Sequence, residues 1–153
     1  MKAYLDTSVV NVLLFSEYSA KDKKRLPSVT EMFEKIDAGM LHAIVSLYAV
    51  QEIFAFCKIT FSPEKAGYVA RESVGELCKH KFELIGLLTR MERLIYKRNF
   101  VLEDSTDQPH AIAAFIHSCD HIVIFDHHYD VLKSQFSIVT PAELVKKLKA
   151  SQK

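Results

Sequence analysis

The sequence has few cysteines and no long apolar run. Its three cysteines, Cys57, Cys78 and Cys119, are an odd number without close pairing. This pattern excludes a disulfide framework and is typical of a reducing cytoplasm, where we expect the thiols to act as small apolar residues. No apolar run approaches the length that crosses a bilayer, and no signal-peptide pattern precedes the first expected strand. The sequence therefore predicts a soluble, cytoplasmic protein with no membrane partner.

The sequence also lacks a large net charge. Twenty Lys and Arg residues against nineteen Asp and Glu residues give +1 at pH 7. The cations nevertheless gather in three segments, residues 21–25, 79–81 and 90–98. Such segments can guide a phosphate backbone, although they are more often solvated helix faces.

Length and composition indicate one compact domain. The chain has 153 residues, 49% of them hydrophobic and 25% charged, which is enough to bury a sizeable core. No internal repeat, linker or low-complexity tract divides it. We expect a single domain at residues 1–150 and a polar tail at 151–153.

Apolar patterns predict alternating strands and helices. Strands are expected at residues 2–5, 41–46, 121–125 and 137–139, with a further short strand at 101–102. Helices are expected after residue 6, at 47–57, from Pro63, at 78–98, from Asp107 with Thr106 as its cap, and from Pro141. Another helix should begin at Ser28, whose spacing from Glu31 is that of a capping box. This alternation predicts a three-layer α/β/α sandwich with a mainly parallel central sheet of four to five strands.

Four acidic residues stand where an α/β fold gathers ligands. Asp6 and Asp126 each follow an expected strand, Glu52 lies in the second turn of a helix, and Asp107 opens another helix. Open parallel sheets bind ligands beyond the carboxyl ends of their strands, so these residues are expected to converge. Clustered carboxylates repel one another unless a cation lies between them. An all-oxygen ligand set suits Mg²⁺ or Mn²⁺.

Each acid also has a purely structural interpretation. Asp6 can cap the first helix, and Asp107 can complement the dipole of its helix. Asp126 fits a turn after a strand. Glu52 is harder to explain in this way, because a carboxylate between apolar neighbours is costly unless it is paired or bound to a ligand.

Motifs spread along the chain resemble the PIN domain family. They are Leu5-Asp6-Thr7-Ser8, Ser46 with Glu52, Asp107-Gln108-Pro109-His110, residues 119–126 ending in Ile122-Val123-Ile124-Phe125-Asp126, and Val139-Thr140-Pro141-Ala142-Glu143. Any one of them is weak evidence. Together, in this order and spacing, they are specific.

The resemblance implies a metal-dependent endoribonuclease. It assigns Asp6, Glu52, Asp107 and Asp126 as catalytic residues and ligands of Mg²⁺ or Mn²⁺, and a bound metal would activate water for attack on phosphorus. Ser8, Thr7 and His110 are expected to support the site, and Asp104 and Asp130 are possible additional acids. Many small members of the family are toxins of toxin–antitoxin pairs. The expected partners are therefore single-stranded RNA, an antitoxin protein and a second copy of the chain.

One departure from the family pattern keeps an alternative open. The family usually has Thr or Ser two residues before its last acid, where this chain has Ile124. Loss of that hydroxyl can weaken the orientation of the carboxylates. The alternative is a catalytically weak or inactive PIN-like module that binds RNA or protein.

Two further hypotheses are weaker. A phosphatase of the haloacid dehalogenase type needs a second Asp two residues after the first, and Ser8 occupies that place. His127-His128, beside Asp126, allow a transition-metal or general-acid role, but neighbouring histidines after a strand usually face solvent.

Overall fold

The computed structural model describes residues 1–151, except for the side chains of His127 and His128. The hypothesis of a transition-metal or general-acid role for these two histidines concerns side chains that the structure does not describe. Residues 152–153 of the expected polar tail also lie outside the described part.

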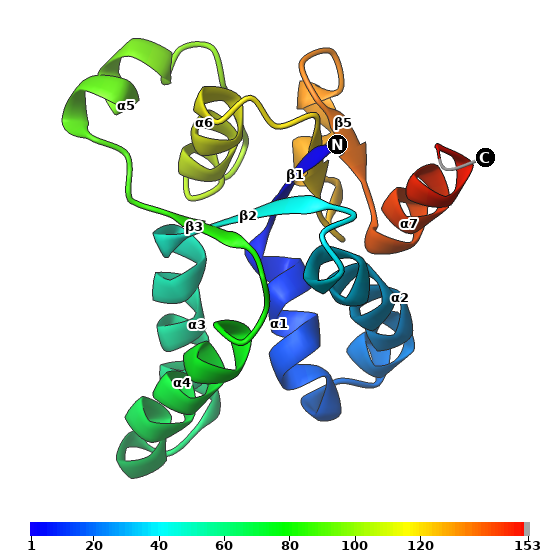
Figure 1. Ribbon diagram of the computed structural model, residues 1–153. Helices are drawn as coiled ribbons and strands as arrows, with labels where there is room; N and C mark the ends of the chain where they lie inside the picture. The colour runs from blue at the N-terminus through cyan, green and yellow to red at the C-terminus, as the bar shows by residue number, and fades with distance from the viewer. Residues whose placement is uncertain (152–153) are drawn as a thin grey trace.

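A five-stranded parallel sheet forms the centre of the molecule (Figure 1). Its strands stand in the order β3-β2-β1-β4-β5 and are β1 (Lys2–Leu5), β2 (His42–Ser46), β3 (Glu83–Ile85), β4 (His121–Val123) and β5 (Ser137–Val139). Every neighbouring pair is parallel, for example Tyr4 beside Ile44 and Ile122. All carboxyl ends therefore meet at one edge of the sheet.

Helices cover the sheet on both faces, which confirms the predicted α/β sandwich. They are α1 (Thr7–Phe15), α2 (Ala20–Asp37), α3 (Leu47–Thr60), α4 (Pro63–Leu77), α5 (Arg90–Tyr96), α6 (Gln108–Ile116) and α7 (Pro141–Ala150), with short 3-10 helices η1 (Ser16–Tyr18) and η2 (His127–Leu132). Figure 1 shows α5 and α6 on one side of the central strands and α1 to α4 on the other.

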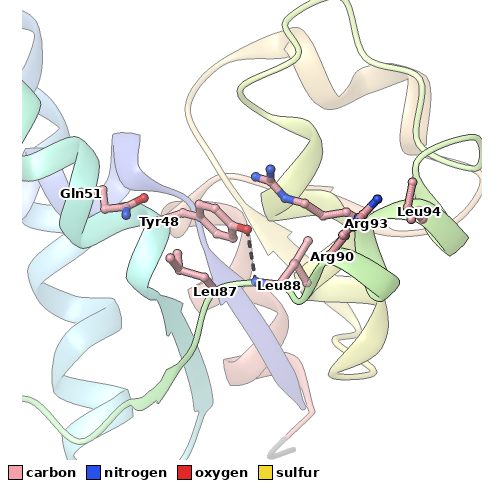
Figure 2. Close-up of a pocket in the computed structure, with 7 residues that line it drawn as sticks. All are labelled: Tyr48, Gln51, Leu87, Leu88, Arg90, Arg93 and Leu94. Carbon is pink, nitrogen blue, oxygen red and sulfur yellow. Dashed lines mark hydrogen bonds between the residues drawn. The ribbon is translucent and has the colours of Figure 1, made fainter.

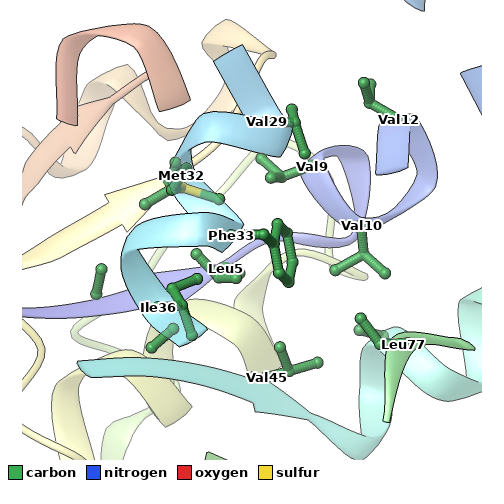
Figure 3. Close-up of a cluster of buried hydrophobic side chains, with 14 of the residues drawn as sticks. Leu5, Val9, Val10, Val12, Val29, Met32, Phe33, Ile36, Val45 and Leu77 are labelled. Carbon is green, nitrogen blue, oxygen red and sulfur yellow. The ribbon is translucent and has the colours of Figure 1, made fainter. Parts of the chain in front are cut away.

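The first face of the sheet is closed by an aliphatic core (Figure 3). Leu5 and Val45 point from β1 and β2 towards Phe33 and Ile36 of α2 and Val10 of α1. All five are fully or almost fully buried. Burying a side chain of this size contributes about 1.5–3 kcal/mol, so this face supplies much of the driving force for folding.

The second face has a core of mixed character. Tyr4, Ile44 and Ile122 alternate with the strand residues of the first face and pack against α6 and the segment around Tyr129. Because side chains alternate along a strand, Asp6 continues the face of Tyr4, and Ser46 continues the face of Ile44. Polar groups thereby enter the edge of this second core.

The segment after α4 is not the long helix that its apolar spacing predicts. Residues 83–85 instead form β3, with Val45 beside Leu84. A separate short helix begins at Arg90, where Thr89 and Glu92 form a capping box. The expectation of one helix over 78–98 is therefore wrong. Pairing with the open edge of β2 outweighs the local helical pattern, as tertiary context often does.

Other expected boundaries are also wrong. The second helix begins eight residues before Ser28, after the cap Ser19, and continues through Pro27. Asp107, not Thr106, holds the cap position of α6, while Thr106 bonds to the Asp104 carboxylate.

Two expected strands differ as well. The residue pair 101–102 forms no strand, and β4 ends at Val123, although the amide of Ile124 still bonds to the Val139 carbonyl.

Two features of the structure concern the cysteines and the apolar helices. Cys57 and Cys119 are buried, Cys78 is exposed, and all three thiols are free. Within the described chain, no helix combines the length and apolar character needed to cross a membrane.

Candidate active site at the carboxyl edge of the sheet

Asp6 lies at the end of the central strand β1 and caps α1. Its carboxylate accepts a 2.8 Å hydrogen bond from the Ser8 amide, and the residue is only 7% exposed. Burial raises the pKa of Asp6, and the charge of Glu52 adds to this effect, while His110 and Ser8 oppose it. The capping interpretation is therefore correct, but the cap alone does not offset the cost of burying this charge.

His110 is the centre of a buried hydrogen-bond network. Its Nδ1 lies 2.8 Å from the Tyr4 hydroxyl, which donates to the Ser46 hydroxyl at 2.7 Å. Its Nε2 lies 3.3 Å from a carboxylate oxygen of Glu52. Burial opposes protonation of His110, but Glu52, Asp6 and Asp107 together outweigh it and raise the histidine pKa. A protonated His110 donates through both ring nitrogens, which satisfies both contacts.

Glu52 projects from the second turn of α3 towards this histidine. Burial alone would raise its pKa, but the hydrogen bond with His110 and the charge of that histidine outweigh burial, so that the Glu52 pKa is lowered. Its side chain is 40% exposed, so one side of the carboxylate remains open to solvent. Glu52 is thus ionised and bonded to His110 of α6.

Asp107 brings a third carboxylate from the start of α6. The charge of Asp107 acts on both His110 and Tyr129, and the Tyr129 hydroxyl donates to the Asp107 carbonyl at 3.1 Å. The charge of Asp104 also acts on Glu52, where it opposes the lowering of the Glu52 pKa. The charges of Asp6, Glu52 and Asp107 thus act on one imidazole, although these residues come from three distant parts of the chain.

Asp126 follows β4 at the same edge of the sheet. Its exposed side chain lines two surface pockets, one with Ser8 and one with Asp130. The Ser8 hydroxyl accepts a 3.3 Å hydrogen bond from the Phe125 amide, which fixes the end of β4 against α1. Ile124 is buried in the second core, so packing occupies the place where a hydroxyl was expected.

The expected additional acid Asp130 has another partner. It forms a 3.0 Å ion pair with Lys133 in the next turn.

The donor atoms fit a hard divalent cation in their chemistry, since carboxylate oxygens are the ligands that Mg²⁺ and Mn²⁺ prefer. Among the side chains that the structure describes, however, no three of His, Cys, Asp or Glu stand close enough to share an ion. Glu52 lies within hydrogen-bond distance of His110, whereas convergence of the four expected ligands on one ion stays a prediction.

Sequence reasoning missed Tyr4 and Tyr129, and it gave Ser46 no role beyond its place in the motif with Glu52. Tyr4 sits in an apolar strand and resembles an ordinary core residue, yet its separation of two residues from Asp6 places both on one face. That spacing was the available signal. Nothing in the sequence marks Tyr129, which reaches the site only because η2 folds back beneath α6.

The fold is PIN-like, as comparison with solved structures indicates. VapBC2 from Rickettsia felis, solved bound to a DNA fragment from its promoter, contains a chain with a TM-score of 0.62 and 10% identity, over 90% of this chain and 97% of that one. FitAcB from Neisseria gonorrhoeae contains a chain with a TM-score of 0.60 and 14% identity, over 91% and 97%. At these identities the likeness concerns the fold alone. No family model and no curated protein matches the sequence.

Proposed function

We propose that this protein is a metal-dependent endoribonuclease that hydrolyses phosphodiester bonds of single-stranded RNA. The observation that carries the proposal is the 3.3 Å contact between Glu52 and His110 at the carboxyl edge of the sheet, where the charges of Asp6 and Asp107 act on the same imidazole. Ligands of open parallel sheets bind at this edge. The resemblance of the sequence motifs to PIN domains and the PIN-like fold support the same function.

Charge balance favours a cation at this place. The carboxylates of Asp6, Glu52, Asp107 and Asp104 act on one another or on His110, which supplies one positive charge. The group therefore carries an excess of negative charge, partly in a buried setting where repulsion is strong. Asp6, Glu52 and Asp107 would hold Mg²⁺ or Mn²⁺, and Asp126 would join them from the end of β4.

The side chains of this protein then have distinct tasks. A bound metal would activate a water molecule and neutralise charge that develops on the phosphate. His110 orients Glu52 through Nε2, while Tyr4 and Ser46 fix the imidazole from the other side. Burial keeps the Tyr4 and Tyr129 pKa values well above the ordinary value, so both phenols stay neutral donors.

Cleavage of labelled single-stranded RNA tests the proposal. We expect cleavage with Mg²⁺ or Mn²⁺, none with EDTA, and recovery when either metal is restored. Asp6→Asn and Asp126→Asn should abolish cleavage, whereas the matched exposed variant Asp120→Asn should retain it. Equal cleavage by wild type and Asp6→Asn would refute the site. Recovery only with Zn²⁺ would favour a site containing histidine.

The alternative function is an inactive module that binds RNA or protein. The buried Ile124 favours it, because the hydroxyl that would orient the carboxylates is replaced by core packing. Replacing Ile124 with Thr separates the two functions. A rise in cleavage would show that the missing hydroxyl limits a nuclease, whereas RNA binding without cleavage in both forms would favour the module.

The proposed partners include an antitoxin protein and a second copy of the chain. The helix α5 buries none of its residues and exposes Met91, Leu94 and Ile95, which leaves apolar surface available for a partner. Light scattering after size-exclusion chromatography tests the homodimer. A monomer at micromolar concentration would contradict it.

A further inference from the structure

One side of α3 carries three residues at four-residue intervals. Tyr48, Glu52 and Phe56 follow one another in this way, so they share a helix face. At 1.5 Å of rise per residue, about 12 Å separates the first from the last. Glu52, the candidate ligand, stands between the two aromatic residues.

The first aromatic residue, Tyr48, lines a pocket of about 600 Å³ (Figure 2). Arg90 and Arg93 of α5 border this pocket, and the Arg93 guanidinium lies 5.6 Å from the centre of the Tyr48 ring. The Tyr48 hydroxyl accepts a hydrogen bond from the Leu88 amide at 3.1 Å, which fixes the ring. The same ring lies 5.7 Å from that of His110, so this α5 pocket adjoins the carboxylate group.

The second aromatic residue, Phe56, lines a pocket of about 440 Å³ between α1, α2 and α3. Phe56 packs on Phe15 with a ring separation of 4.7 Å, and Lys21 and Arg25 supply positive charge. Arg25 is engaged by Asp22 at 3.2 Å, so Lys21 is the cation available to a ligand. Asp126 borders this α2 pocket, which therefore also adjoins the candidate site.

We propose that the α5 pocket and the α2 pocket are nucleotide subsites on either side of the cleaved bond, with single-stranded RNA lying along α3. This inference rests on the proposed function. Each pocket combines an aromatic ring with cations, the combination that binds unpaired bases and their phosphates. A duplex keeps its bases stacked inside, so only an unpaired strand can place nucleotides in both pockets.

Binding in EDTA tests the subsites without cleavage. The probe is an eight-nucleotide labelled single-stranded RNA, and fluorescence anisotropy gives its affinity. We expect Arg90→Ala with Arg93→Ala to weaken binding about tenfold and reduce the salt slope by about two, and Lys21→Ala to reduce that slope by about one. The control pair Lys58→Ala with Lys65→Ala removes the same charge from exposed positions outside both pockets, and it should change affinity less than twofold.

Three results would overturn the inference. Pocket variants that bind RNA like the control pair would exclude both subsites. Sensitivity to only one pocket would exclude a strand that spans Glu52. Equal binding of an oligoglutamate of the same charge, with the same sensitivity to the variants, would identify an acidic peptide as the occupant. Melting temperatures equal to that of the wild type show that the variants are folded.

The proposed function can fail separately. If RNA binding depends on the pockets but no metal-dependent cleavage occurs, the nuclease function is wrong and the subsites are supported. If metal-dependent cleavage occurs and is unchanged in the pocket variants, the nuclease function is supported and the subsites are wrong.

Discussion

The two faces of the sheet differ in the side chains that they bury. The first face, under α1, α2, α3 and α4, is a core of aliphatic side chains with Phe33 at its centre. The second face, under α6 and η2, holds Tyr4, His110 and Tyr129 in hydrogen-bonded positions and borders the carboxylates. The first face is thus packed mainly with apolar side chains, whereas the second face also accommodates buried polar and charged groups. Substitutions on the two faces should therefore have different effects.

The largest effect on stability is expected on the first face. Phe33→Ala removes a fully buried ring and should lower the free energy of unfolding by about 3–5 kcal/mol. Denaturant unfolding measures it, with the exposed Tyr68→Ala as control. A loss below about 1 kcal/mol would contradict the assignment of this face as the main source of stability.

A smaller loss is expected from Tyr4→Phe on the second face. The ring stays, but the hydroxyl that joins Ser46 and His110 disappears, so the free energy of unfolding should fall by about 1–3 kcal/mol. Cleavage should fall too, because His110 is no longer fixed. Tyr68→Phe, at an exposed ring, is the matched control. Unchanged stability and cleavage would show that the Tyr4 hydroxyl contributes nothing to this hydrogen-bond network.

Asp6→Asn should leave stability unchanged or raise it at neutral pH. Because the folded-state pKa of Asp6 is raised, the folded protein binds a proton more readily than the unfolded chain. The wild type therefore loses stability as the pH rises from the ordinary Asp value through the folded pKa. The variant does not lose stability in this way, so it should gain stability relative to the wild type as the pH rises through this range. Unfolding curves from acid to neutral pH measure it, and a variant less stable than wild type at neutral pH would contradict the account.

The smallest effect is a pH dependence through His110. Its folded-state pKa is raised, so its contribution to stability is complete below the ordinary His value of 6.5 and is lost as the pH rises through the folded pKa. His110→Gln should remove this part of the pH dependence. Unfolding measured on both sides of that range tests it, and parallel curves for the two proteins would show that His110 is not charged in the fold.

The sequence predicts the frame of the fold well. Four of the five strands follow apolar runs, and α7 begins at Pro141 as the sequence predicts. The unexpected strand β3 could not be read locally, because its residues fit a helical spacing and only the free edge of β2 makes them a strand. A strand that forms only by pairing with the edge of a distant strand is therefore not predicted from local sequence patterns.

The assignment of Asp6, Glu52, Asp107 and Asp126 as metal ligands stays a prediction. The sequence does not predict the hydrogen bonds around His110. The contact between His110 and Glu52 spans 58 residues, and that between Tyr4 and His110 spans 106, so no local pattern reveals them.

The most direct test of the central claim is the position of Mn²⁺ in a soaked crystal, located by its anomalous scattering. The account predicts one ion or a pair among the oxygens of Asp6, Glu52 and Asp107, with the Asp126 side chain turned towards them. An anomalous peak only at unrelated surface acids, or none at saturating Mn²⁺, would contradict the claim that these carboxylates form a metal centre.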